Sequence, residues 1–323
     1  MPAPDVGSSA KPRVLVIDPI AYQEMAGPIR TQLNALFDTT FLWMRDDKDT
    51  YLERHGGEFT AFISRAGLTT ALLELLPNLQ IIAQTGAGLD GVPLDYIRGR
   101  GIALTNARGV LSDDVADIAI GLMLSAAREL GRGERLVRSG GWTKERPGLA
   151  RRANRKTYGI VGMGSIGSAI ARRLMGFDGT ILYHNRRPVT GSPYAYVADL
   201  KAMATQADFL FIATPGGAGT ANLVDEDVLR ALGPDGIVVN VGRGTTLDEA
   251  ALLKTLGDGG LGGAGLDVHR SEPHVNPELM KFESVVLLPH LGSSTVETRM
   301  AMHQVCIDNI LAHFAGAPLL TPV

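Results

Sequence analysis

The stretch that decides the fold is Thr157-Tyr-Gly-Ile-Val-Gly-Met-Gly-Ser-Ile-Gly167. It opens with a short apolar, β-prone run, and a helical pattern at 168–175 and a second strand pattern at 180–184 follow it. In this setting Gly162 permits a tight turn, Gly164 lets backbone approach a pyrophosphate, and Gly167 lets helix and strand pack closely. The helix N-terminus offers free N–H groups to the phosphates. The sequence therefore predicts a dinucleotide-binding βαβ unit whose phosphate loop is Gly162, Met163, Gly164, Ser165, Ile166 and Gly167.

The residues after the second strand of this unit indicate which dinucleotide binds. An NAD site has Asp or Glu about twenty residues beyond the glycines, where it holds the ribose hydroxyls. Here Asn185, Arg186 and Arg187 occupy that place. Two guanidinium groups and an amide suit a 2′-phosphate, and no carboxylate repels it. We therefore expect NADPH/NADP+ to be preferred, with NADH as a possible second cofactor.

Composition places the chain among ordinary globular proteins. It has 323 residues, a net charge of −3, and hydrophobic and charged shares of 45% and 20%. Nothing in that balance favours nucleic acid or an anionic membrane, and there is no apolar run of transmembrane length. The basic cluster between Arg146 and Lys156 is interpreted as a solvated connector. Cys306 is the only cysteine, and the first dozen residues lack a secretory h-region, so we expect a cytoplasmic protein.

Strand-like and helix-like stretches alternate along the whole chain, which is typical of α/β folds with parallel sheets. A proline-free segment at 113–138, apolar on one face, predicts one long helix between domains, and a last helix is expected at 295–314. The predicted fold is two doubly wound, Rossmann-like domains. The nucleotide-binding domain at 108–290 is expected to be inserted into a discontinuous substrate domain made of 1–107 and 291–323. The expected strands are 13–18, 40–43, 60–64, 80–84, 102–105, 157–161, 180–184, 208–212, 236–240, 263–267 and 284–288.

Three chemically distinctive side chains follow successive strands of the second half, namely Arg243, Glu272 and His290. Ligands in open α/β sheets gather beyond the carboxyl ends of the strands. Singly, each residue has an ordinary interpretation as a salt-bridge partner, a surface charge or a cap. Together they suit reduction of a 2-keto acid: His290 can donate the proton, Glu272 can orient its ring, and Arg243 can hold a carboxylate. The remaining histidines show no metal-ligand spacing, so no metal site is expected.

On these and further motifs the chain resembles the D-isomer-specific 2-hydroxyacid dehydrogenase family over nearly its whole length. The motifs are Gly86-Ala-Gly-Leu-Asp90, Asp113-Asp-Val-Ala-Asp-Ile-Ala-Ile-Gly121, Gly162 to Gly167, Asn240 to Gly244, Gly265-Leu-Asp-Val268 with Glu272-Pro273, and Pro289 to Ser294 with Glu297-Thr-Arg299.

The resemblance implies that Arg243, Glu272 and His290 are the catalytic set. It also implies that backbone N–H groups around Ala87 and Gly88 cradle the substrate carboxylate beside Arg243 and His290. Asp267 is expected near the nicotinamide amide and Gly292 near the ring. The cofactor contacts it implies beyond the phosphate loop and residues 185–187 are Thr214, Pro215, Thr220, Val241, Gly242, Arg243, Asp267, His290 and Gly292.

The Asp-Asp-Val-Ala-Asp stretch and the Asn-Arg-Arg ending resemble the NADPH-using glyoxylate/hydroxypyruvate reductase branch. That branch implies reduction of a small 2-keto acid to the D-2-hydroxy acid, and family members are typically homodimers joined through the nucleotide-binding domain. Three departures affect the expected pocket: Gly91, the pair His269-Arg270 in place of an apolar-led pair, and the glycine-rich loop 215–220.

Alternative functions remain open at this point. A formate dehydrogenase of this family would pair the histidine with glutamine, and Glu272 disfavours it; a phosphite dehydrogenase is another enzyme on the same scaffold. A corepressor-like NAD(P)-binding protein could retain the Arg/Glu/His set without turnover. A reductase of bulkier, aromatic 2-keto acids is also compatible with the motifs, because the substrate-side loops are poorly defined by the sequence.

Overall fold

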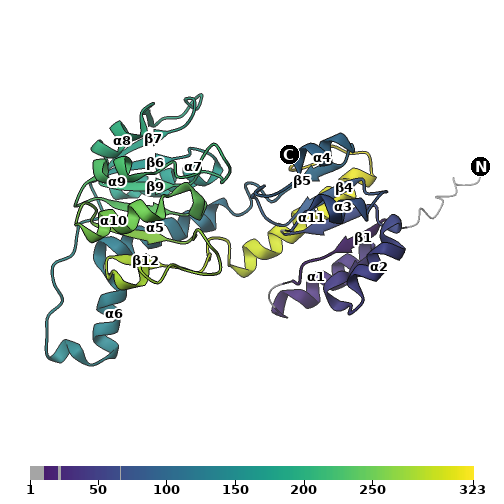
Figure 1. Cartoon of the computed structure of the whole chain (residues 1–323), viewed down its shortest axis with the longest axis horizontal. Helices are drawn as coiled ribbons and strands as arrows, with labels where there is room; N and C mark the ends of the chain where they lie inside the picture. The colour runs from purple at the N-terminus through teal and green to yellow at the C-terminus, as the bar shows by residue number, and fades with distance from the viewer. Residues whose placement is uncertain (1–10, 21–22, 66) are drawn as a thin grey trace, which may run out of the picture. The chain divides into compact units, whose positions relative to one another are not determined.

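The computed structural model describes residues 11–20, 23–65 and 67–323, and the chain divides into two compact units. Unit 1 comprises residues up to Val110 together with Thr295–Val323, and unit 2 comprises Leu111–Ser294. Each unit is a parallel sheet with helices on its faces (Figure 1). The predicted α/β class with two Rossmann-like sheets is confirmed.

Within its described residues, unit 1 contains five parallel strands in the order β2-β1-β3-β4-β5. Alternate residues of β1 point to opposite faces, so Val14 and Val16 join one apolar core while Leu15 joins the other. Ile307 and Ile310 of the last helix complete the first core, which ties the C-terminal segment to the N-terminal strands. The strands are β1 (Arg13–Val16), β2 (Asp38–Phe41), β3 (Ala61–Ser64), β4 (Ile81–Gln84) and β5 (Ala103–Thr105). The helices are α1 (Gln23–Leu36), α2 (Lys48–His55), α3 (Thr70–Glu74), α4 (Leu94–Gly99) and α11 (Val296–Phe314).

Unit 2 contains seven parallel strands in the order β12-β11-β10-β9-β6-β7-β8. Six of them lie where apolar runs predict them; β8 has only two residues, too few to give a sequence pattern. The strands are β6 (Thr157–Val161), β7 (Thr180–His184), β8 (Ala195–Tyr196), β9 (Phe209–Ile212), β10 (Ile237–Asn240), β11 (Gly263–Leu266) and β12 (Val285–Leu287). The helices are α5 (Ser112–Arg128), α6 (Leu130–Arg138), α7 (Ser165–Leu174), α8 (Leu200–Gln206), α9 (Glu226–Leu232) and α10 (Glu249–Gly257).

The prediction of one continuous helix over 113–138 is wrong. Glu129 adopts a left-handed conformation with φ of 50°, which ends α5 and starts α6 in a new direction. Gly131 and Gly133 follow immediately, and glycine weakens a continuing helix. α5 packs against α7, β10 and β11 within unit 2, whereas α6 has no buried residue.

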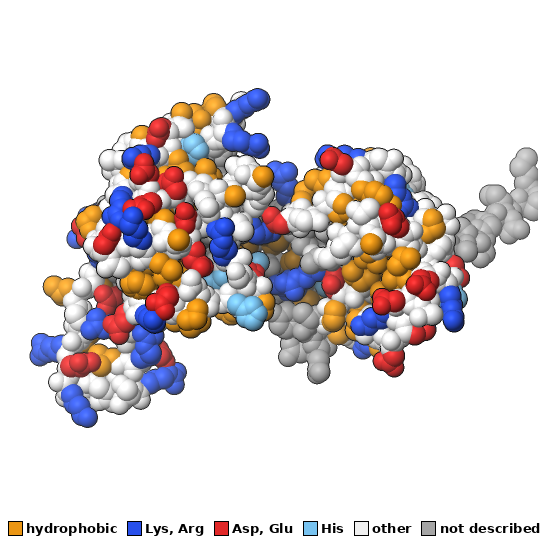
Figure 2. All heavy atoms as spheres, in the orientation of Figure 1, with side chains coloured by type: hydrophobic (Ala, Val, Ile, Leu, Met, Phe, Trp, Pro, Cys, Tyr) orange, Lys and Arg blue, Asp and Glu red, His pale blue; other side chains and the backbone are white. Residues whose placement is uncertain are grey.

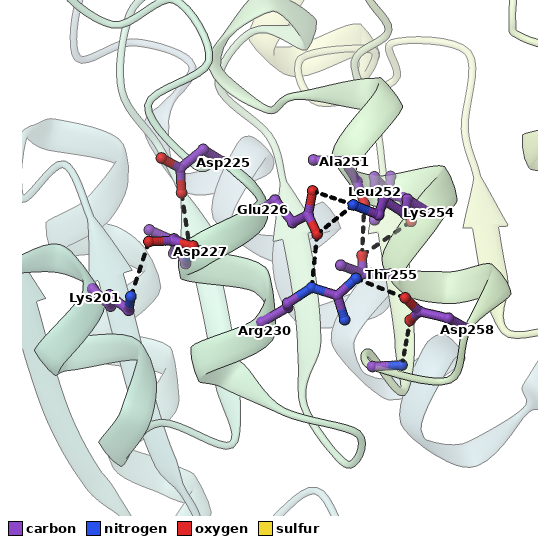
Figure 3. Close-up of polar contacts among 12 residues, drawn as sticks. Lys201, Asp225, Glu226, Asp227, Arg230, Ala251, Leu252, Lys254, Thr255 and Asp258 are labelled. Carbon is purple, nitrogen blue, oxygen red and sulfur yellow. Dashed lines mark hydrogen bonds and ion pairs between the residues drawn. The ribbon is translucent and has the colours of Figure 1, made fainter.

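Charged side chains connect the helices on one face of unit 2 (Figure 3). Arg230 of α9 pairs with Glu226 at 2.8 Å and with Asp258 at 2.6 Å, and Lys254 of α10 pairs with Glu226 at 2.8 Å. These groups are solvent-exposed, so each pair stabilises the fold little. Packing holds these helices instead, through the buried side chains Val228, Leu229, Ala251 and Leu252.

Basic and acidic side chains are interspersed on the faces of both units drawn in Figure 2. No helix within the described residues is long and apolar enough to cross a membrane. The described part of the chain also contains no cluster of His, Cys, Asp and Glu that could hold a metal ion.

Candidate active site

The predicted catalytic residues lie on loops at one edge of the unit 2 sheet. Arg243 comes three residues after β10, Glu272 lies in the loop after β11, and His290 comes three residues after β12. These strands are parallel neighbours, so the loops that follow them emerge at the same edge. The phosphate loop Gly162–Gly167 follows β6 of the same sheet and leaves it at this edge.

Glu272 and His290 form a hydrogen-bonded pair. His290 Nδ1 lies 2.7 Å from Glu272 Oε2, and the backbone N–H of His269 donates to Glu272 Oε1 at 2.9 Å. Partial burial raises the pKa of Glu272, but the hydrogen bonds from His290 and His269 outweigh it and hold the pKa below its ordinary value. Glu272 is therefore ionised at neutral pH and accepts two N–H bonds.

The backbone at His290 is fixed in an uncommon conformation. His290 has a φ of 56°, and its N–H donates to the carbonyl of Asp267 at 2.9 Å. The buried Asp267 carboxylate accepts the N–H groups of Leu291 at 2.7 Å and Gly292 at 2.9 Å. A Cβ at Gly292 would lie 3.0 Å from Asp267 Oδ2 and 3.1 Å from Val115, so glycine permits this close approach. Asp267 therefore holds the loop that presents the His290 ring.

The loop that carries Arg243 is equally constrained. The buried Asn240 side chain donates to the carbonyl of Arg243 at 2.9 Å and accepts the N–H of Gly242 at 3.0 Å. Arg243 Nη1 donates to the carbonyl of Gly242 at 2.8 Å. A Cβ at Gly244 would overlap the carbonyl group of His269. The close packing at Gly244 joins the loop after β10 to the loop after β11.

The phosphate loop fits a bound dinucleotide. Gly162 has a φ of 98°, and a Cβ at Gly167 would overlap the carbonyl of Gly162, so both positions require glycine. Above Gly164 no atom lies within 4 Å of an added Cβ, which leaves space for a pyrophosphate. α7 begins at Ser165, and its first N–H groups have no acceptor among the described residues.

The residues after β7 divide into two groups. Asn185 Oδ1 accepts the N–H of Met163 at 2.6 Å, so this side chain holds the phosphate loop in shape. Arg186 and Arg187 are exposed, and neither forms an ion pair with the described part of the chain. The two guanidinium groups are therefore available to an anionic ligand, while the amide oxygen of Asn185 is already engaged.

The remaining predicted cofactor contacts follow β9 and β10. Thr214 carries a buried hydroxyl without a hydrogen-bond partner in the described structure, so it can bond to a ligand group. Thr220 closes the glycine-rich loop by donating to the carbonyl of Pro215 at 2.7 Å. Val241 is buried directly after β10. These positions fit a ribose or nicotinamide group at the sheet edge.

The predicted substrate cradle lies in unit 1, directly after β4. The N–H groups of Ala87 and Gly88 have no acceptor among the described residues. The side chain of Asn106 donates to the carbonyl of Ala87 at 3.0 Å, and the N–H of Ala107 donates to the carbonyl of Gly86 at 3.0 Å. Asn106 carries no role in the sequence-based prediction, and its only sequence signal is a polar residue directly after a predicted strand.

The chain belongs to the D-isomer specific 2-hydroxyacid dehydrogenase family. Residues 120–292 match the model of that family's NAD binding domain. The protein is thus an NAD(P)-dependent oxidoreductase with a Rossmann-like nucleotide-binding domain.

Proteins of known activity are similar to this chain over most of their length. It is 41% identical over 301 residues to a glyoxylate/hydroxypyruvate reductase A of Arabidopsis thaliana, covering 93% of this chain and 96% of that protein. It is 42% identical over 258 residues to a 2-ketogluconate reductase of Gluconobacter oxydans, covering 80% and 83%. Among solved structures, an NADPH-dependent glyoxylate/hydroxypyruvate reductase of Sinorhizobium meliloti, in complex with NADP and malonate, superposes with a TM-score of 0.86 at 38% identity, over 97% of both chains.

Proposed function

We propose that this protein reduces small 2-keto acids of the glyoxylate and hydroxypyruvate type to D-2-hydroxy acids, with NADPH as the preferred cofactor. The observation that carries the proposal is the Glu272–His290 pair at 2.7 Å, on the sheet edge that also bears the phosphate loop. The activities of the related reductases support the same reaction class. Unit 2 is the nucleotide-binding domain in this proposal, and unit 1 is the substrate domain.

His290 is the proton donor to the substrate oxygen. NADPH, when bound, would supply the hydride for the ketone carbon, and the ketone oxygen would then need a proton. Because Nδ1 of His290 faces Glu272, its proton stays on that hydrogen bond and Nε2 is left for the substrate. The ionised Glu272 accepts this Nδ1 hydrogen bond, so its negative charge lies beside the ring that donates the proton. In the reverse direction the same nitrogen accepts the proton of the hydroxy acid.

A carboxylate next to the ketone is the group that defines the substrate. The Arg243 guanidinium can bind it through charge-assisted hydrogen bonds and can polarise the ketone oxygen. In unit 1, the N–H groups of Ala87 and Gly88 are neutral donors of the kind that bind a carboxylate. Polar groups that pair with the substrate distinguish it from other keto acids better than an apolar pocket does. This favours small polar keto acids as substrates.

Cofactor binding is assigned to the phosphate loop, to Thr214 and to the residues after β7. The first turn of α7 would receive the pyrophosphate, and Arg186 and Arg187 would receive the 2′-phosphate. Asn185 supports this site indirectly, because its side-chain oxygen accepts a hydrogen bond from the Met163 N–H and so holds the phosphate loop.

A homodimer is part of the proposal. α6 and the segment after it expose apolar side chains in unit 2, which is the pattern expected of a surface covered in an assembly. These side chains are Leu130, Val137, Trp142 and Leu149. A cytoplasmic location stays a prediction of the sequence.

Steady-state kinetics with NADPH and a panel of 2-keto acids test the proposal. We expect kcat/KM for glyoxylate and hydroxypyruvate to exceed that for pyruvate, and chiral analysis to identify D-glycerate as the product from hydroxypyruvate. A preference for phenylpyruvate would overturn the small-substrate assignment alone. Methyl esters that react as well as the free acids, or normal kcat/KM in Arg243→Ala, would overturn the carboxylate clamp. Absence of turnover with every acid would favour a binding protein.

A further inference from the structure

We propose that His269 is a positioning residue that sets the Glu272–His290 pair for proton transfer by joining the three loops of the site. The inference rests on the proposed reductase function. The pair His269-Arg270 departs from the apolar-led pair usual in the family, and the proposed reaction gives the imidazole no task.

The backbone and the ring of His269 serve different loops. Its N–H donates to Glu272 Oε1 at 2.9 Å, so it fixes one oxygen of the carboxylate whose other oxygen holds His290. Its ring Nε2 lies 2.8 Å from the carbonyl of Leu288, two residues before His290. One residue therefore links the loop that carries Glu272 to the segment that carries His290.

The third loop packs against the same residue. An added Cβ at Gly244 would overlap the carbonyl group of His269 and crowd the N–H of Arg270, so the chain next to Arg243 lies directly on this backbone. Arg270 itself turns outward and donates to Asn222 Oδ1 at 2.8 Å. The positions of Arg243, Glu272 and His290 are thus coupled through the backbone of one residue and through its ring.

The ring geometry of His269 defines which of its two nitrogens donates a hydrogen bond. A carbonyl accepts only, so Nε2 carries a proton and donates it to Leu288. His269 is only 8% exposed, and the buried Nδ1 has no partner in the described structure. Nδ1 is then the ring nitrogen without a proton, because a proton there would be a buried donor without an acceptor. Glu272 and His290, in the two loops that His269 contacts, form the reactive pair.

The test compares two substitutions at one position. His269→Phe keeps an aromatic ring but removes the donor to Leu288, and His269→Gln keeps an N–H at a similar reach. For His269→Phe we expect kcat for keto acid reduction to fall about threefold to tenfold, the range that corresponds to one lost hydrogen bond, with little change in KM. The loss of reductase activity at high pH should begin at lower pH, because a less firmly held Glu272 interacts more weakly with His290. His269→Gln should restore both.

Tyr158→Phe is the matched control, because the buried Tyr158 hydroxyl also donates to a backbone carbonyl, that of Ala153 at 2.7 Å, in the same unit. Tyr158→Phe should lose about as much stability as His269→Phe, but its pH profile of reductase activity should match the wild type. In the Glu272→Gln background, His269→Phe should give no further shift. If His269→Phe does not fold, His269→Asn replaces it, since Asn is too short to reach Leu288. A wild-type kcat and pH profile in the folded variant would overturn the inference. An inactive wild type would instead overturn the proposed function.

Discussion

The exposed pair Arg186 and Arg187 gives a quantitative prediction for cofactor choice. Neither side chain has a hydrogen-bond or ion-pair partner among the described residues, so replacing one by alanine breaks no internal hydrogen bond or ion pair. A hydrogen bond to a charged group contributes about 1.5–3 kcal/mol, and the solvent exposure of these side chains places the value at the lower end. About 1.5 kcal/mol corresponds to a factor of about ten in Kd. Arg186→Ala should therefore weaken NADPH about tenfold and leave NADH nearly unchanged.

Titration of the two cofactors against wild type and variant at fixed ionic strength measures this difference. Arg152→Ala is the control, because Arg152 is also an exposed arginine of unit 2 but precedes β6 and is assigned no cofactor contact. Repeating the titration at higher salt should shrink the NADPH advantage of the wild type, since the contact is electrostatic. Equal weakening of NADPH and NADH in Arg186→Ala, or a wild type that prefers NADH, would refute the assignment of the 2′-phosphate site.

Three further predictions concern the acid–base pair, the substrate cradle and pH stability. Glu272→Gln removes the carboxylate that favours the protonated His290, so the alkaline loss of reductase activity should begin at lower pH; an unmoved profile would remove Glu272 from this role. Asn106→Leu leaves the Ala87 carbonyl without its donor at 3.0 Å, so KM for the keto acid should rise about threefold to tenfold while the Kd of NADPH is unchanged; the reverse pattern would contradict the cradle. Burial, together with Arg299 and Arg65, lowers the pKa of His303 from 6.5 to about 4, so the unfolded chain takes up this proton first as pH falls below 6.5. The free energy of unfolding should therefore fall by about 1–2 kcal/mol between pH 6.5 and about pH 5. Urea unfolding of His303→Gln over the same pH range should not show this part of the fall.

The sequence predicts most of the parallel strands because they are short apolar runs between turn residues. β2 (Asp38–Phe41) is not such a run, and the predicted range of 40–43 lies two residues too late. The sequence does not predict features that lack such an apolar run. β8 is too short to give a pattern, and the break between α5 and α6 depends on the left-handed backbone at Glu129. The apolar periodicity of residues 113–138 does not predict that conformation.

The sequence also places Arg243, Glu272 and His290 after successive strands, as the structure does, but it does not reveal what each side chain contacts. The residues after β7 were expected to face the 2′-phosphate together, yet the Asn185 oxygen accepts the Met163 N–H. Asp267 was expected near the nicotinamide amide, and its two oxygens accept N–H groups from the His290 loop. The loop that makes the Asp267 contacts has a positive φ at His290, which only the folded structure shows.

His290→Ala, measured for both turnover and cofactor binding, tests the central claim most directly. The substitution removes the proton donor but leaves the phosphate loop and the Arg186–Arg187 pair in place. We predict that kcat for hydroxypyruvate falls by about 10²–10⁴ while the Kd of NADPH stays within about twofold of wild type. A variant that keeps wild-type kcat would contradict the assignment of His290 as the acid and base of the reaction.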